Sequence, residues 1–217
     1  MRYLILLILG FTAFHANATL VSISNCSLPD PANNCLINDG IPGTVSQDPN
    51  NNQLITWDEK QNYTLTQDLR VDRVFDPSAS FVTDLGNGDY LLKAGTVISS
   101  HYIQWDSNGA GGVEATINLD SQVFGFITSR SNLLNSDYLG RTGVTYLDFA
   151  YRGSEPGDLT TFNGTNTDID WYTTSPGDWA RLITAYSPGA TVPEPGSLAL
   201  LGLGLVGMGL RRRKRSN

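Results

Sequence analysis

The stretch VEATINLD, residues 113–120, places an apolar residue at every second position. Val113, Ala115, Ile117 and Leu119 alternate with polar side chains. Successive side chains of a β-strand point to opposite faces, so this period of two predicts a strand with one buried and one exposed face. The strand indicates a sheet that covers a hydrophobic core on one side.

Other short segments on both sides of this strand are rich in β-branched and aromatic residues. They are GTVISSHYIQW at 95–105, QVFGFITS at 122–129, GVTYLDF at 143–149, DIDWYT at 168–173 and WARLITAY at 179–186. Turn clusters such as DSNGAGG and SEPGD separate them. The pattern predicts an all-β domain over residues 53–187, a two-sheet sandwich of the jelly-roll or immunoglobulin-like kind. One helical turn is expected within residues 129–140.

The first 18 residues have the three parts of a secretory signal peptide. Arg2 supplies a positive charge, residues 4–14 form an apolar core, and Ala16 and Ala18 give an A-x-A pattern before Thr19. Because the core is short for a bilayer span, we expect a signal helix that directs export through the Sec machinery. Signal peptidase is expected to cleave it after Ala18.

The segment at residues 19–52 is rich in Asn, Pro, Ser and Asp and predicts loops. It contains the two cysteines of the chain, Cys26 and Cys35. In an oxidising compartment these are expected to form a disulfide. Two thiols with no nearby histidine do not suffice for a zinc site.

The charge of the chain is unevenly distributed. Residues 19–192 carry 8 basic and 20 acidic side chains, a net charge of −12. An acidic body repels phosphate backbones, so a nucleic-acid partner is not expected. The basic residues cluster instead near the end of the sequence, as Arg211, Arg212, Arg213, Lys214 and Arg215.

The C-terminal part predicts a linker, a short membrane helix and a cytoplasmic tail. Residues 188–195 are rich in Pro and Gly, residues 196–210 are almost wholly apolar, and residues 211–217 contain the basic cluster. Basic residues after an apolar span act as a stop-transfer signal on the cytoplasmic side. A G-x-G-x-x-G spacing occurs at 202–207. The few residues after it cannot complete a βαβ unit, so it predicts no nucleotide site.

The segment VPEPGSLALLGLGLVGMGLRRRKR, residues 192–215, resembles the PEP-CTERM sorting signal of Gram-negative bacteria. The resemblance implies that Val192, Pro193, Glu194 and Pro195 form the recognition motif of a membrane-embedded exosortase. It also implies an inner-membrane-anchored precursor, removal of the tail near the motif, and delivery of the body to the cell surface or extracellular matrix.

Catalysis is not expected from the body of the chain. Its one histidine, His101, lies in a predicted strand, and no G-x-S-x-G motif accompanies it. Its glutamates are Glu59, Glu114 and Glu155, and their spacing does not place two of them across a cleft. The expected role is therefore structural or binding, with exopolysaccharide as a candidate partner. The alternatives are a carbohydrate-binding module and a secreted polysaccharide hydrolase.

Two further features bear on binding. Calcium is a candidate cofactor, because NGTNTDID supplies four oxygen donors, at Asn163, Asn166, Asp168 and Asp170. The four tryptophans could form a platform for sugar rings. We expect them to fill the core instead, since large aromatic side chains dominate sandwich cores.

Overall fold

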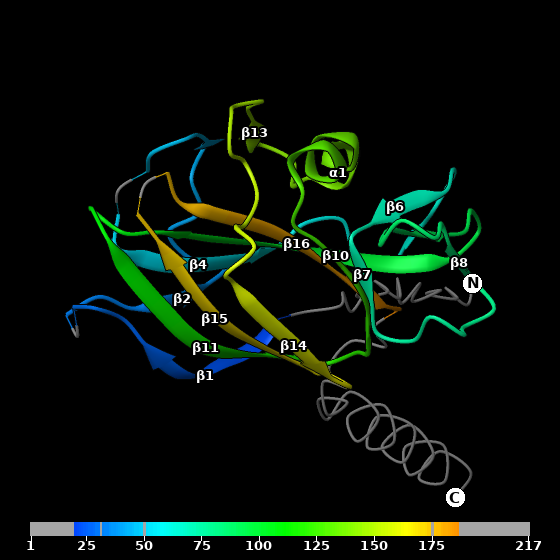
Figure 1. The fold of residues 1–217 in the computed structure, drawn as a ribbon, viewed down its shortest axis with the longest axis horizontal. Coiled ribbons are helices and arrows are strands. Elements are labelled where there is room, and N and C mark those ends of the chain that lie inside the picture. Colours follow the sequence, from blue (N-terminus) through cyan, green and yellow to red (C-terminus); the bar gives the residue numbers. More distant parts are fainter. Residues whose placement is uncertain (1–19, 31, 50, 175, 187–217) are drawn as a thin grey trace, which may run out of the picture.

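The computed structural model describes residues 20–30, 32–49, 51–174 and 176–186, which form an all-β fold (Figure 1). One sheet has the strand order β1, β11, β15, β14, at Leu20–Ser27, Gly111–Leu119, Asn166–Thr173 and Leu159–Asn163. A seven-stranded sheet has the order β2, β4, β10, β16, β12, β7, with β5 also paired to β10. Its strands are Cys35–Ile37, Gln53–Asp58, Val97–Asp106, Asp178–Ala185, Val123–Ile127, Arg73–Val74 and, for β5, Tyr63–Thr64.

Two small sheets and two short helices complete the described fold. Strands β3, Thr44–Val45, and β13, Thr145–Tyr146, form a parallel pair. Strands β6, β9 and β8, at Leu69–Val71, Tyr90–Leu92 and Val82–Asp84, form a three-stranded antiparallel sheet. Helix α1, Arg130–Asn135, and the 3-10 helix η1, Asp137–Leu139, confirm the helical turn expected there.

The four-stranded and seven-stranded sheets pack face to face over one hydrophobic core. The alternating residues of β11 enter this core from one side, and Ile103, Trp105 and Leu182 enter it from the other. In Figure 1, β1, β11, β15 and β14 lie together as one layer beside β4, β10 and β16. The one-sided strand predicted at 113–120 is therefore confirmed, with the polar residues of β11 on the open face.

A second core lies on the other face of the seven-stranded sheet. Trp57, Tyr102 and Ile183 of that sheet pack there against Leu133 of α1 and Val71 of β6. The central strand β10 is buried along nearly its whole length, since both of its faces are covered. The all-β expectation is confirmed, but the fold has more than the two expected sheets. The jelly-roll or immunoglobulin-like assignment stays a prediction.

Several segments differ from the expected secondary structure, since β1, β2 and β3 all lie within residues 19–52, which were expected to be loops. Residues 20–27, expected to be loop, form the edge strand β1, whose side chains are mostly exposed and whose register with β11 shifts twice. Such a strand needs no apolar alternation, so the sequence carries no strand signal. The strand expected at 143–149 is reduced to Thr145–Tyr146, because Val144, Tyr146 and Phe149 pack on the core from an irregular segment.

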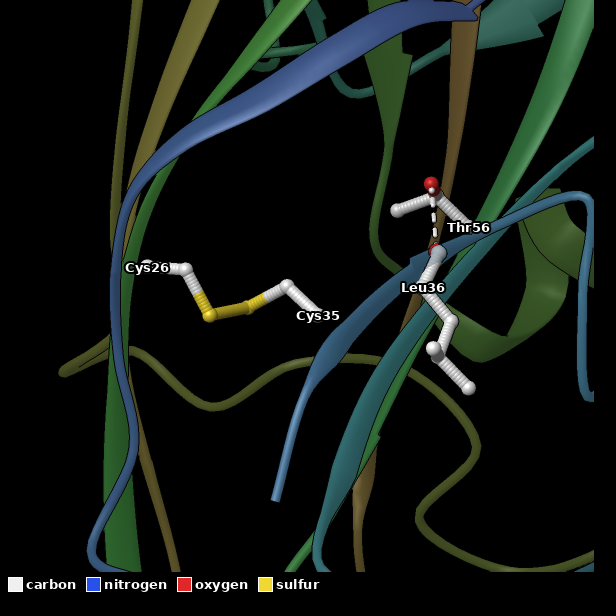
Figure 2. Close-up of a disulfide and its surroundings, with 4 residues drawn as sticks. All are labelled: Cys26, Cys35, Leu36 and Thr56. Atoms are coloured by element: carbon white, nitrogen blue, oxygen red, sulfur yellow. Dashed lines mark hydrogen bonds between the residues drawn. A yellow bond between two sulfur atoms is a disulfide. The ribbon is translucent and has the colours of Figure 1, made fainter. Parts of the chain in front are cut away.

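The expected disulfide between Cys26 and Cys35 is present, with the two Cα atoms 6.2 Å apart. It joins the end of β1 to the start of β2, so it links the two large sheets (Figure 2). The neighbouring strand pair is held by Thr56, whose hydroxyl donates to the Leu36 carbonyl at 3.1 Å. The link therefore fixes an edge strand that buries little surface of its own.

Replacing both cysteines by serine is expected to lower the free energy of unfolding by about 2–3 kcal/mol, because the unfolded chain regains the freedom of the closed loop. Thermal melts of the full chain measure the loss as a lower Tm. Adding a reductant to the unmutated chain should reproduce the change, and it should leave the serine variant unaffected. Equal melting temperatures for the two chains would contradict a stabilising role.

The expected signal helix at 1–18 and membrane helix at 196–210 lie outside the described residues. None of the helices within the described ranges has the length and apolar character needed to cross a bilayer.

Candidate functional site

Most of the predicted site residues fall outside the part of the chain that the structure describes. These are the signal cleavage residues, the sorting motif at 192–195 and the basic cluster at 211–215. The sites that can be described lie in the β-domain. They are the predicted calcium residues, the buried polar networks of the seven-stranded sheet, and an acidic cleft.

The predicted calcium residues are spread along the hairpin of β14 and β15. Asn163 and Asn166 face each other at its end, and Asp168 and Asp170 follow on the exposed face of β15. Same-face neighbours on a strand are about 7 Å apart, so these side chains do not converge by strand geometry. The Asp168 carboxylate instead accepts a hydrogen bond from the Thr116 hydroxyl at 2.6 Å. Calcium binding at this turn stays a prediction.

His101 lies in a buried polar chain between the two large sheets. Its Nδ1 is 2.7 Å from Asp58 Oδ1, and its Nε2 is 3.2 Å from the Thr184 hydroxyl. Burial acts to raise the pKa of Asp58, but the hydrogen bond and charge of His101 outweigh it, so that pKa lies below its ordinary value. Asp58 also accepts from the Leu20 backbone N–H at 3.1 Å, which ties β1 to β4. Asp58, His101 and Thr184 follow one another as the acid, base and hydroxyl of a catalytic triad do. His101 is only 1% exposed, however, so its ring is shielded from solvent.

Glu59 is one of the glutamates that a glycoside hydrolase could use. In the structure it forms a buried ion pair with Arg181. Its two carboxylate oxygens accept from Arg181 Nε at 2.6 Å and Nη2 at 2.9 Å, and both side chains are fully buried. Burial acts to lower the pKa of Arg181, but Glu59 outweighs it and holds the pKa above its ordinary value. Arg181 also donates to the Leu133 carbonyl and the Ser136 hydroxyl, which anchors α1 on the sheet.

The tryptophans fill the cores, as expected. Trp57, Trp105, Trp171 and Trp179 are all 0% exposed, so the described structure offers no row of exposed indole rings for a sugar. The sugar-platform alternative for the tryptophans is therefore wrong.

A cleft of about 220 Å³ lies where the loop between β13 and β14 approaches the start of β16. Its lining is formed by Thr128, Ser129, Arg130, Tyr151, Arg152, Gly153, Ser154, Glu155, Pro156 and Asp178. Three carboxylates gather there, since ligand oxygens of Glu155, Asp158 and Asp178 all lie within 4.8 Å of one another. This cluster is the candidate functional site, and we call it the acidic cleft.

Backbone hydrogen bonds fix the loop that carries Glu155 and Asp158. The Glu155 N–H donates to Asp158 Oδ2 at 2.7 Å, and the Asp158 N–H donates back to the Glu155 carbonyl at 3.1 Å. Asp158 Oδ1 accepts from the Tyr172 N–H of β15 at 3.0 Å. The Trp179 N–H donates to the Gly153 carbonyl at 2.8 Å, which holds the loop beside β16. These hydrogen bonds therefore hold the loop that carries Glu155 and Asp158 in a fixed position against the start of β16.

Gly153 allows this close approach. Its φ of +147° is rarely adopted by residues with a side chain, and an added Cβ would lie 2.2 Å from the Thr128 carbonyl oxygen. The glycine therefore lets the loop lie directly on the end of β12, next to Asp178.

Asp178 is the most unusual of the three carboxylates. Burial, followed by the charges of Asp158 and Glu155, raises its pKa to about 9. Burial and Asp158 also raise the pKa of Glu155. When all three groups are ionised, none has a hydrogen to donate to another, so their mutual contacts are repulsive. The cluster is therefore costly without a positive charge, either a proton or a cation.

Replacing Asp178 by Asn is expected to stabilise the chain in a chelating buffer at pH 8, by about 1–3 kcal/mol. In the folded chain Asp178 keeps its proton up to a pH of about 9, whereas the ordinary pKa of an aspartate is 3.8. Unfolding thus releases a proton between these values, and the stability of the unmutated chain falls as pH rises through that window. Asn has no proton to lose.

Thermal melts of both chains at pH 5 and pH 8 measure this difference. The advantage of Asp178→Asn should shrink toward pH 5, whereas Asp170→Asn, on the exposed face of β15, should change stability by less than about 0.5 kcal/mol. An Asp178→Asn chain that is less stable at pH 8 than the unmutated chain would contradict the account.

The sequence did not indicate that these three residues form one site. Glu155 and Asp158 belong to SEPGD at 154–158, and Asp178 ends SPGD at 175–178. Each segment on its own reads as a turn. The pairing of β16 with β10 and the hydrogen bond from Trp179 to Gly153 bring them together, and neither contact has a signal in local spacing.

The fold and these contacts define an all-β protein with a sandwich core, a disulfide between its large sheets and an acidic cleft. A family model described as the PEP-CTERM protein-sorting motif matches residues 191–214, so the chain carries this motif at its C-terminus. No curated protein and no solved structure matches the chain significantly. The motif implies export, sorting to the cell surface and processing by an exosortase.

Proposed function

We propose that this protein is a non-enzymatic surface or matrix component, which its C-terminal signal delivers and whose β-domain has a structural or binding role. The observation that carries the proposal is the sorting motif at 191–214. In this proposal the precursor passes through the Sec machinery, loses its signal peptide, and stays anchored in the inner membrane until an exosortase acts. The β-domain is then released to the surface or to the extracellular matrix.

The polar interior of the β-domain supports a structural or binding role. Glu59 lies in a fully buried ion pair with Arg181, and His101 is buried between Asp58 and Thr184. Groups held in this way stabilise the fold and are shielded from a substrate. Exopolysaccharide is the proposed partner class in the matrix, and a glycan-array screen of the full chain tests for it.

The sorting proposal is tested by replacing Pro193, Glu194 and Pro195 together with alanine. The unmutated chain is expected at the cell surface or in the medium. The triple variant is expected to stay in the membrane fraction several-fold more, because the exosortase no longer recognises the tail. Quantitative immunoblots of surface, periplasmic and membrane fractions measure this distribution.

Two further chains complete the experiment. Pro188→Ala, in the same linker but outside the motif, is the matched control and should be sorted like the unmutated chain. A chain lacking residues 193–217 should be soluble in the periplasm. If the triple variant or the truncated chain reached the surface as the intact chain does, the proposal would be wrong.

A further inference from the structure

We propose that Glu155, Asp158 and Asp178 bind one calcium ion in the acidic cleft. The site is distinct from the hairpin residues at 163–170, which are spread along a strand. The proposal rests only on the described β-domain, so it stands or falls separately from the sorting proposal.

The carboxylate of Asp178 is buried beside two others. The residue is 1% exposed, and its Oδ2 accepts no hydrogen bond from the described residues, while a protonated Asp178 can share its proton with Asp158. A carboxylate oxygen withdrawn from water normally accepts hydrogen bonds or binds a cation. Here the nearby groups include two further carboxylates, which are acceptors themselves and cannot donate a hydrogen bond when ionised. A cation bound among them would supply the missing positive charge.

The ligand oxygens of the three carboxylates lie close together. Ligand oxygens of the three residues lie within 4.8 Å of one another. Calcium binds oxygen at about 2.3–2.6 Å, so two of its ligands can be up to about 5 Å apart. Magnesium binds at about 2.0–2.1 Å and requires a tighter, octahedral arrangement. All three oxygens therefore lie within the reach of one calcium ion, whose flexible coordination tolerates irregular spacing.

The basic side chains that line the cleft are already paired with other acidic residues. Arg130 and Arg152 line the cleft, but each is already paired, Arg130 with Asp148 and Arg152 with Asp137, both at 2.6 Å. Asp106 adds a further negative charge near Asp178. The arginines are thus neutralised by their own partners, and no basic side chain among the described residues pairs with the three carboxylates, so the positive charge must come from a proton or a bound cation.

The site has room for further ligands, and part of it is already held in place. Calcium takes six to eight oxygen ligands, of which three carboxylates supply only part. The cleft of about 220 Å³ beside Asp178 has space for waters to supply the others. The carboxylate of Asp158 is already oriented by the backbone N–H groups of Glu155 and Tyr172, and each of its oxygens can still bind a cation.

The test uses the full chain, purified in detergent and stripped of metal with EDTA. Isothermal titration with calcium chloride should give one site per chain. About 1 mM calcium, a level suited to extracellular calcium modules, should raise the Tm by about 5 °C above its value in EDTA. Magnesium at the same concentration should give a much smaller shift.

Variants then locate the site. Asp178→Asn and Glu155→Gln should each abolish the calcium-induced shift, and their Tm in EDTA shows that they are folded. The pair Asp168→Asn and Asp170→Asn is the matched control, because it removes two carboxylates from the exposed hairpin and should keep the full shift.

Several results would overturn the proposal. They are no shift and no titration heat at about 10 mM calcium, a shift that persists in Asp178→Asn and Glu155→Gln, and a shift lost in the Asp168→Asn and Asp170→Asn control. Equal stabilisation by magnesium would overturn the assignment of calcium.

Discussion

Replacing Arg181 by Met is expected to lower the free energy of unfolding by about 3–5 kcal/mol. The change leaves Glu59, which is 0% exposed in its side chain, as a buried charge without its partner. It also removes the hydrogen bonds to Leu133 and Ser136 that hold α1 on the seven-stranded sheet. The measurement is the midpoint and slope of urea unfolding of the full chain, followed by tryptophan fluorescence.

Arg70→Met is the matched control. Arg70 pairs with Asp89 on the surface, where its side chain is 43% exposed, so its loss should cost less than about 1 kcal/mol. Adding Glu59→Gln to Arg181→Met should restore part of the lost stability, because the buried negative charge is gone. If Arg181→Met and Arg70→Met had the same effect, the buried network would not contribute as described.

Replacing Trp105 by Ala is expected to cost about 3–5 kcal/mol and to lower the Tm by on the order of 10 °C. Trp105 is 0% exposed on β10 and lies between the two large sheets with Ile103, Leu182 and Val113. Its removal leaves a cavity that the surrounding strands, all hydrogen-bonded to neighbours, cannot close. Thermal melts and urea titration measure the loss.

Tyr172→Ala is the control for this prediction. Tyr172 lies on β15 of the same sandwich, but its side chain is 59% exposed, so its loss should change stability by less than about 0.5 kcal/mol. If the Trp105→Ala chain had the same Tm as the Tyr172→Ala chain, the burial of the tryptophan in a well-packed core would be contradicted.

The strands of this fold were predictable where burial is one-sided. In β11 the apolar residues Val113, Ala115 and Ile117 alternate with polar ones because one face of the strand is buried in the core and the other is open. The strand β10 was predictable for another reason, since its β-branched and aromatic residues suit a strand with both faces covered. The edge strand β1 was not predictable, because a strand with one neighbour and exposed side chains can consist largely of Ser and Asn.

The candidate site was less predictable than the fold. Oxygen donors close in sequence, such as Asp168 and Asp170, point along one exposed strand face and do not converge. The carboxylates that do converge come from two turns brought together by the long-range pairing of β10 with β16. The polar partners of His101 and Arg181 are likewise set by strand register, which composition and local spacing do not encode.

The sorting tail, in contrast to the acidic cleft, was predictable from the sequence. The motif at 191–214 was recognisable because its information lies in local order: a Pro-Glu-Pro sequence, an apolar stretch and a basic cluster. A signal read by a membrane enzyme does not require a tertiary fold. Sequence alone therefore indicates where this protein goes more directly than what its β-domain binds.

In the proposed function, an exosortase processes this chain at its C-terminal motif and so delivers the β-domain to the surface. The most direct test is mass spectrometry of the C-terminus of the chain recovered from the cell surface. We expect a C-terminus near residues 192–195 and, in cells without exosortase, a chain in the membrane fraction that still contains residues 196–217. A surface chain that still carries Arg211–Arg215 would contradict it.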